Sequence, residues 1–170
     1  MPPPEFHAAR FADLDARTLH DLLRLRGDVF VVEQECAYPD IDGRDIEPQT
    51  RHLWLARNGA PVAYLRILVD AGGVARIGRV AVAKAARGEG LAGRLMDEAL
   101  TLVGDRTCVL EAQSYLVAFY ARYGFAVTGA KYVDDGIPHV PMRREPGPGA
   151  VQPAQGRAAT SSATDRRRPV

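Results

Sequence analysis

Residues 79–93 read RVAVAKAARGEGLAG, an apolar run that leads into the one glycine-rich turn of the chain. The run from Ala75 to Ala83 is typical of a strand, and Gly90 to Leu102 has apolar residues at helical spacing. Backbone N–H groups and the positive end of a helix dipole converge on an anion where such a turn joins a strand to a helix. We therefore predict that the glycine turn (residues 87–93) holds a phosphate group. A tight connection that binds nothing is the plainer alternative.

The segments around the glycine turn predict a mixed α/β domain with one dominant sheet. Asn58-Gly59 and residues 70–73 are hairpin signals, so the strands before the glycine turn are expected to be antiparallel. Strands are expected at residues 5–10, 52–57, 61–69, 75–83, 107–112, 125–132 and 139–143. Helices are expected after a cap at Asp13, from Gly90 to Leu102, and from a cap at Ser114 to Tyr123.

The composition indicates one domain that binds neither nucleic acid nor a membrane. With 22 Lys plus Arg against 21 Asp plus Glu, the 170-residue chain has a net charge of only +1, too balanced for either partner. No apolar run approaches the roughly 18 residues of a spanning helix. The first residues lack a signal-like pattern, so a cytoplasmic location is expected. Cys36 and Cys108 stand far apart without CxxC spacing, which predicts neither a disulfide nor a metal site.

The domain is expected to occupy residues 1–145. From Pro146 onward the chain has four Pro and three Gly, with only Val151 and Val170 as sizeable apolar residues. This is too little apolar surface to offset the entropy lost on ordering, so residues 146–170 are predicted to form a disordered tail rich in Pro, Ala and Arg.

Charge is distributed unevenly within the domain. The acidic segment (residues 28–47) has seven acids and one arginine, whereas residues 76–94 have five basic residues and one acid. Two poles of this kind suggest two ligands, an anion at the glycine turn and a cation near the acidic segment. Two solvated surface patches are the alternative.

Residues 88–93 also satisfy the dinucleotide pattern GxGxxG, and Glu111 follows 18 residues later, near the place of a ribose-binding acid. That motif has its first glycine directly after a strand, whereas residues 84–87 intervene here. It also opens a parallel sheet, whereas the strands before the turn are expected to be antiparallel. Nicotinamide binding is therefore the distant alternative, and a P-loop is excluded because no GK[ST] follows the glycines.

Two motifs in this order resemble a known family. The strand Arg79-Val80-Ala81-Val82, followed by RGEGLA at 87–92, resembles the R/Q-x-x-G-x-G/A pyrophosphate loop of GNAT acetyltransferases and the strand before it. FYARYGF at 119–125 resembles the FY-x-x-x-GF segment of that superfamily. The resemblance covers Phe6 to Arg144. Within the family, the sequence resembles the ElaA-type branch more narrowly, at residues 26–36, 42–45, 52–53, 111–113 and 135–139.

This resemblance implies a mixed, mostly antiparallel central sheet, flanked by helices, with a V-shaped splay between two parallel central strands, 75–83 and 107–112. Coenzyme A would lie in that splay, with acetyl-CoA as the donor. Contacts to the pantetheine and acetyl carbonyl would come from Val80, Ala81 and Val82. The pyrophosphate would be held by Arg87, Gly88, Glu89, Gly90, Leu91, Ala92 and Gly93. Ala92 replaces the last glycine of the commonest pattern, which a small residue satisfies.

Acetyl transfer from a thioester to an amine requires a neutral amine, a polarised carbonyl and a protonated or stabilised thiolate. Tyr120 matches the tyrosine that often protonates the thiolate in GNAT enzymes, and contact with the coenzyme or packing beside Phe119 is its alternative. Glu33 and His139 are the favoured bases, with Glu111 and His52 also considered. Residues considered for substrate contact are Glu33, Asp42, Asp45, His52, Gln113 and Ser114, of which Glu33, His52 and Gln113 are favoured.

The expected function is therefore an acetyl-CoA-dependent N-acetyltransferase that moves the acetyl group directly to a primary amine in a ternary complex. Neither cysteine has a partner for a covalent acyl-enzyme. The acceptor, which a cationic amine would fit, is not determined by the sequence, and neither is the oligomeric state. A catalytically silent, acyl-CoA-binding regulatory protein is the alternative.

Overall fold

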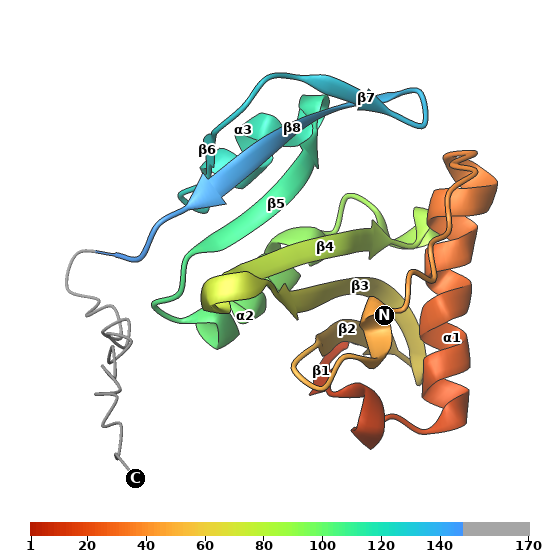
Figure 1. Ribbon diagram of the computed structural model, residues 1–170. Coiled ribbons are helices and arrows are strands. Elements are labelled where there is room, and N and C mark those ends of the chain that lie inside the picture. Colours follow the sequence, from red (N-terminus) through yellow and green to blue (C-terminus); the bar gives the residue numbers. More distant parts are fainter. Residues whose placement is uncertain (148–170) are drawn as a thin grey trace, which may run out of the picture.

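The structure is a computed structural model and describes residues 1–147. Within them, eight strands form one sheet in the order β1-β2-β3-β4-β5-β8-β6, and β7 also pairs with β8 (Figure 1). The strands are β1 (Glu5–Ala9), β2 (Arg51–Arg57), β3 (Ala60–Val69), β4 (Ala75–Val82), β5 (Cys108–Gln113), β6 (Ala126–Val127), β7 (Tyr132–Asp134) and β8 (Ile137–Arg144). Of the predicted tail at 146–170, all but the first two residues lie outside the described part.

Helices cover both faces of the sheet (Figure 1). They are α1 (Ala16–Arg26), α2 (Leu91–Val103) and α3 (Val117–Ala121), and α1 continues as a π-helical turn over Gly27–Glu33. Alternate residues of a strand point to opposite faces. Accordingly, Leu53 and Leu55 of β2 pack in the core with α2, whereas Trp54 and Ala56 pack with α1. No helix within residues 1–147 is long and apolar enough to cross a bilayer.

The two central strands run parallel but separate almost at once. Pairing between β4 and β5 is limited to Ala75 with Cys108 and Arg76 with Val109, and all other pairings in the sheet are antiparallel. Beyond Arg76, β4 stays with β3 while β5 continues with β8, so the two strands diverge (Figure 1). The predicted mixed sheet with a V-shaped splay is confirmed.

A bulge bends β4 on the edge of the splay. Tyr64 pairs with Ala81 and Arg66 with Gly78, so Arg79 and Val80 both lie opposite Leu65. Arg79 has a φ of +54°, a value that L-residues other than Gly seldom adopt. The bulge lies in β4 just before residues 80–82, which lead to the glycine turn.

Three local expectations were wrong. Asp15, not Asp13, caps α1, because its carboxylate accepts hydrogen bonds from the Thr18 N–H and hydroxyl, both at 2.8 Å. Ser114 caps no helix: it lies in a 3₁₀ turn before α3, and its buried Oγ has no hydrogen-bond partner among the described residues. Residues 125–132 form only the short strand β6 and the start of β7.

Candidate active site

A cleft of about 1060 Å³ opens where β4 and β5 separate. Its walls are the bulge of β4, the glycine turn, α3, the π-helical turn and the hairpin of β7 and β8. It is lined by most of the predicted site residues, namely Glu33, Val80, Ala81, Val82, Arg87, Gly88, Gly90, Leu91, Ala92, Gly93, Gln113, Tyr120 and His139. Glu89 and His52 do not line it.

The glycine turn is open and has free backbone donors. The first hydrogen bond of α2 runs from Arg94 N–H to the Gly90 carbonyl (3.1 Å), so the N–H groups of Leu91, Ala92 and Gly93 lack an acceptor within the helix. Gly88 and Gly90 have φ values of +82° and +75°, and a Cβ at either would meet nothing within 4 Å. An anion such as a pyrophosphate fits this arrangement of donors and space.

At two residues of the glycine turn, Gly93 and Glu89, the side-chain position meets another part of the protein. A Cβ at Gly93 would lie 2.9 Å from the Tyr123 hydroxyl, so glycine there permits close approach of the segment after α3 to α2. The Glu89 carboxylate is bound by Arg57 (3.3 Å from Nη1 to Oε1), and Glu89 does not line the cleft. Only the backbone of Glu89 is therefore placed to meet a phosphate.

Tyr120 lies on α3 with its ring buried and 6% of the residue exposed. The ring makes edge contacts with Phe119 and Phe125, with ring centroids 5.0 and 6.3 Å apart. Burial raises the pKa of Tyr120 to about 12, because the phenolate would lose its hydration. The hydroxyl is therefore a proton donor at neutral pH.

His139 lies on β8, paired in register with Gln113 of β5. Its Nδ1 lies 2.8 Å from the carbonyl oxygen of Ile137. A carbonyl can only accept, so Nδ1 carries the proton, and in the neutral ring Nε2 keeps a lone pair. The imidazole stacks on Tyr132 at 5.8 Å. His139 is thus held as a tautomer that can accept a proton.

Glu33 ends the π-helical turn and is bound by Arg87 of the glycine turn. Arg87 Nη2 donates to Glu33 Oε2 at 2.9 Å, and Nη1 donates to Oε1. Hydrogen bonding to this guanidinium holds the pKa of Glu33 below its usual value. While the pair is intact, the predicted base is therefore a poor proton acceptor.

Gln113 joins the opposite walls of the cleft. It lies at the end of β5, where its Nε2 donates to Gln34 Oε1 at 3.2 Å. Gln34 directly follows the π-helical turn. The contact places the π-helical turn beside the strand pair that carries His139.

His52, predicted to contact the substrate, is instead a buried structural residue with 2% exposure. Its Nε2 donates to the Asp45 carbonyl at 2.9 Å, and its Nδ1 accepts from the Tyr64 hydroxyl at 2.7 Å. Burial lowers the pKa of His52, which keeps the ring neutral. The substrate-contact prediction for His52 is not supported, because the residue lies outside the cleft.

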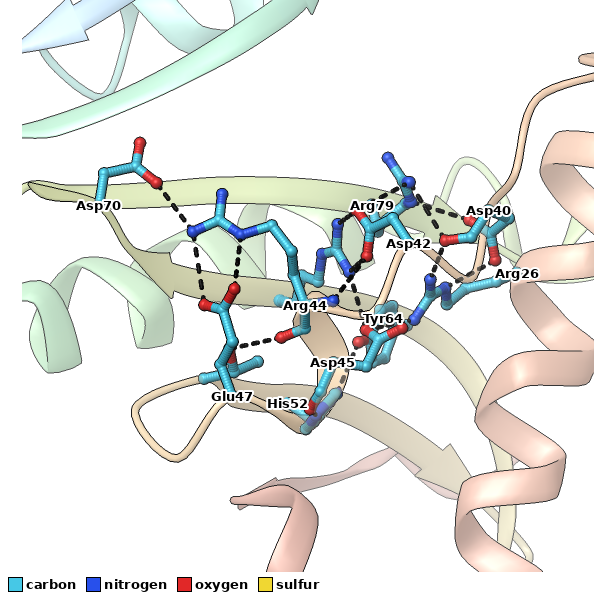
Figure 2. Close-up of polar contacts among 12 residues, drawn as sticks. Arg26, Asp40, Asp42, Arg44, Asp45, Glu47, His52, Tyr64, Asp70 and Arg79 are labelled. Atoms are coloured by element: carbon cyan, nitrogen blue, oxygen red, sulfur yellow. Dashed lines mark hydrogen bonds and ion pairs between the residues drawn. The ribbon is translucent and has the colours of Figure 1, made fainter.

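Three aspartates of the acidic segment are neutralised within the fold, contrary to the expectation that acids of this segment bind a cation. Figure 2 shows Asp40, Asp42 and Asp45 surrounded by arginines. These three aspartates form an arginine–aspartate cluster with Arg26, Arg66 and Arg79. In it, Asp45 is 2.7 Å from Arg26 and 2.9 Å from Arg66, and Asp40 is 3.0 Å from Arg26 and 2.8 Å from Arg79. Arg66 and Arg79 also bind Asp42.

Glu111 belongs to a second chain of ion pairs. Arg44 binds Glu47 and Asp70 (Figure 2). Asp70 also binds Arg76, at 2.7 Å. Arg76 in turn lies 3.6 Å from Glu111, which accepts a 2.8 Å hydrogen bond from the Tyr132 hydroxyl. Glu111 is thus engaged by protein groups, which disfavours the roles of ribose ligand and base. In residues 1–147, no group of three or more His, Cys, Asp or Glu side chains is arranged so that it could hold a metal ion.

Comparison with known proteins agrees with this geometry. Residues 29–146 match the family model described as "Acetyltransferase (GNAT) domain". A UPF0039 protein of Mycobacterium tuberculosis is 52% identical over 144 residues, covering 82% of this chain and 92% of the relative. Protein ElaA of Escherichia coli K12 is 40% identical over 147 residues, covering 83% and 96%.

Two solved structures share the fold at similar identity. The crystal structure of an acyl-CoA N-acyltransferase from Pseudomonas aeruginosa has a TM-score of 0.78 at 43% identity and covers 82% of this chain and 99% of its own. The crystal structure of Escherichia coli ElaA has a TM-score of 0.80 at 39% identity and covers 84% and 99%. The chain therefore belongs to the GNAT acetyltransferase family, which uses acyl-CoA as cosubstrate, and within it to the branch that contains ElaA.

Proposed function

We propose that the protein is an acetyl-CoA-dependent N-acetyltransferase that transfers the acetyl group directly to a primary amine. The observation that carries this proposal is the cleft itself. One space joins an anion-binding glycine turn, the free edge of β4, a buried tyrosine hydroxyl and a histidine with an available lone pair. Proximity of a bound donor and acceptor supplies a large part of such a reaction, so positioning is the main task of the chain.

In this proposal the coenzyme pyrophosphate binds the N–H groups of the glycine turn and the start of α2. The pantetheine follows the edge of β4 that β5 leaves after Arg76, where Val80 to Val82 offer backbone donors and acceptors. A backbone N–H on this edge polarises the thioester carbonyl. The chain contributes no covalent intermediate.

His139 and Tyr120 carry out the proton transfers, from the acceptor amine and to the departing thiolate. Nε2 of His139 accepts the proton that the acceptor ammonium must lose before its nitrogen attacks the carbonyl carbon. As the carbon–sulfur bond breaks, the Tyr120 hydroxyl donates a proton to the departing thiolate, and the second proton that the nitrogen loses on becoming an amide replaces it on Tyr120. Both side chains line the same cleft, from α3 and β8.

A cationic acceptor suits the end of the cleft beside His139. Asp134 and Asp135 line that end, and neither forms an ion pair among the described residues. In contrast, the arginines that line the cleft, namely Arg66, Arg76, Arg79 and Arg87, are all paired with carboxylates. The net field at this end therefore favours an ammonium group.

The test is calorimetric titration with acetyl-CoA, with NADH as control, followed by assay of thiol release with a panel of primary amines. The proposal expects acetyl-CoA binding alone and transfer to a cationic amine. Binding of acetyl-CoA without transfer to any amine would favour the regulatory alternative instead. Binding of NADH alone would contradict the proposal.

The substitution Gly90→Asp is expected to weaken coenzyme A binding about 10- to 100-fold, the effect of losing about one charge-assisted hydrogen bond (~1.5–3 kcal/mol). A carboxylate at this position would face the pyrophosphate. The dissociation constant measured by calorimetry checks it. Gly72→Asp is the matched control, because Gly72 has nearly the same backbone angles (φ 75°, ψ 10°, against 75° and 15°) and lies outside the cleft. Equal affinity of the two variants would contradict the assignment.

A further inference from the structure

Arg87 connects two parts of the cleft that the proposed function assigns to different ligands. Its Nε and Nη2 donate to the carbonyl of Val82, the last residue of β4, at 3.2 and 3.1 Å. Its two terminal nitrogens also donate to Glu33, which lies 54 residues earlier in the chain. Four of the five guanidinium N–H groups are used by these contacts if each donates one hydrogen bond. Arg87 therefore binds the end of β4 and the π-helical turn at once.

The π-helical turn is what places Glu33 against Arg87. Gln34 N–H donates to Val29 O at 3.1 Å and Cys36 N–H to Phe30 O at 3.0 Å, spacings of five and six residues that widen the end of α1. Val29 and Phe30 are buried against the sheet and anchor the turn. Such widened turns are uncommon and occur mostly at functional sites. The next residue lining the cleft is Gln34, which reaches Gln113 beside His139.

The Glu33–Arg87 ion pair lies where a bound pyrophosphate would compete for the guanidinium. Arg87 is the first residue of the glycine turn, next to the open positions Gly88 and Gly90. The ion pair is partly exposed, with 41% and 33% of the two side chains accessible, so its own strength is modest. A pyrophosphate offers more charge and more acceptor oxygens than a single carboxylate.

Building on the proposed function, we propose that Arg87 exchanges partners when coenzyme A binds: the pyrophosphate takes the guanidinium and the Glu33 carboxylate is released into the cleft, where it receives the acceptor ammonium group. Arg87 and Glu33 are then positioning residues that couple the donor site to the acceptor site. The coupling makes acceptor binding stronger after coenzyme A has bound. By thermodynamic linkage, a bound acceptor strengthens coenzyme A binding by the same factor.

Calorimetry with coenzyme A tests this exchange before any acceptor is known. Glu33→Gln is expected to bind coenzyme A about two- to fivefold more tightly than the wild type, because no exposed ion pair has to be broken. Asp28→Asn is the matched control: it removes the same charge from the same π-helical turn, but Asp28 is exposed and does not line the cleft. Its affinity should equal that of the wild type. In an Arg87→Ala background, Glu33→Gln should have no effect.

If Glu33→Gln binds coenzyme A no more tightly than the wild type, the exchange is overturned. It is also overturned if Glu33→Gln tightens binding equally in the Arg87→Ala background, because the tightening would then come only from removing a negative charge near the pyrophosphate. A crystal structure with coenzyme A should show Arg87 on the pyrophosphate and Glu33 beyond hydrogen-bond distance, and a retained ion pair there would also overturn it. A wild-type protein that binds no coenzyme A would overturn the proposed function itself, which separates the two failures.

Discussion

Tyr120→Phe is expected to lower kcat about 100- to 10,000-fold, the usual contribution of a general acid, while the dissociation constant of coenzyme A changes less than about twofold. The substitution removes only the hydroxyl. The ring is buried between Phe119 and Phe125 and should keep its place. With the pKa of Tyr120 raised to about 12 by burial, the wild-type phenol stays protonated at neutral pH.

Tyr123→Phe is the matched control for this prediction. Tyr123 follows α3 on the same segment, but its hydroxyl approaches Gly93 and the residue does not line the cleft. Its loss should leave kcat within about twofold of the wild type. If Tyr120→Phe keeps more than about a tenth of the activity, or if both variants lose activity alike, Tyr120 serves only for packing.

Local signals allowed much of the fold to be predicted from the sequence. The Asn58-Gly59 turn has φ values of +50° and +78°, as a hairpin of this kind requires, and it fixes the register of β2 and β3. The glycine turn was predictable for the same reason, because its conformation depends on residues that are neighbours in the chain. Tyr120 and His139 were singled out largely through the resemblance.

The remaining features depend on contacts between distant residues. Nothing local requires a positive φ at Arg79, a residue that seldom adopts one, so the bulge in β4 has no sequence signature. The three clustered aspartates of the acidic segment were interpreted as free because their partners lie 14 to 39 residues away in the chain, at Arg26, Arg66 and Arg79. A usable signal was present: Arg66 interrupts the otherwise apolar strand β3, and an arginine buried there requires a buried acid.

Asp45→Asn is expected to lower the free energy of unfolding by about 3–5 kcal/mol, the usual cost of removing one partner from a buried ion pair. Asp45 is 4% exposed and accepts hydrogen bonds from Arg26 and Arg66, which are themselves 1% and 3% exposed. Its loss leaves three arginines, of which Arg26 and Arg66 are buried, to share the two remaining aspartates. Chemical denaturation of the two proteins measures the difference.

Asp13→Asn is the control for this change, because Asp13 forms an exposed ion pair with Arg10 at 3.0 Å, and such pairs contribute about 0–1 kcal/mol. Burial opposes ionisation of Asp45, but Arg26 and Arg66 outweigh it and hold its pKa below the usual value. The stabilisation is therefore complete above the unfolded-state pKa of about 3.9 and is lost as the pH falls toward the lower folded-state pKa. The wild type should lose stability in this acid range, and Asp45→Asn should lose less.

Equal stability of the Asp45 and Asp13 variants would contradict a structural role for the arginine–aspartate cluster. The expected outcome has a consequence for the active site, since Asp40 and Asp42 of the same cluster bind Arg79 at the bulge of β4. Val80, the next residue, lies on the edge of β4 that faces the cleft. Asp40 and Asp42 then support the proposed site by holding the shape of β4, and they do not need to bind a cation themselves.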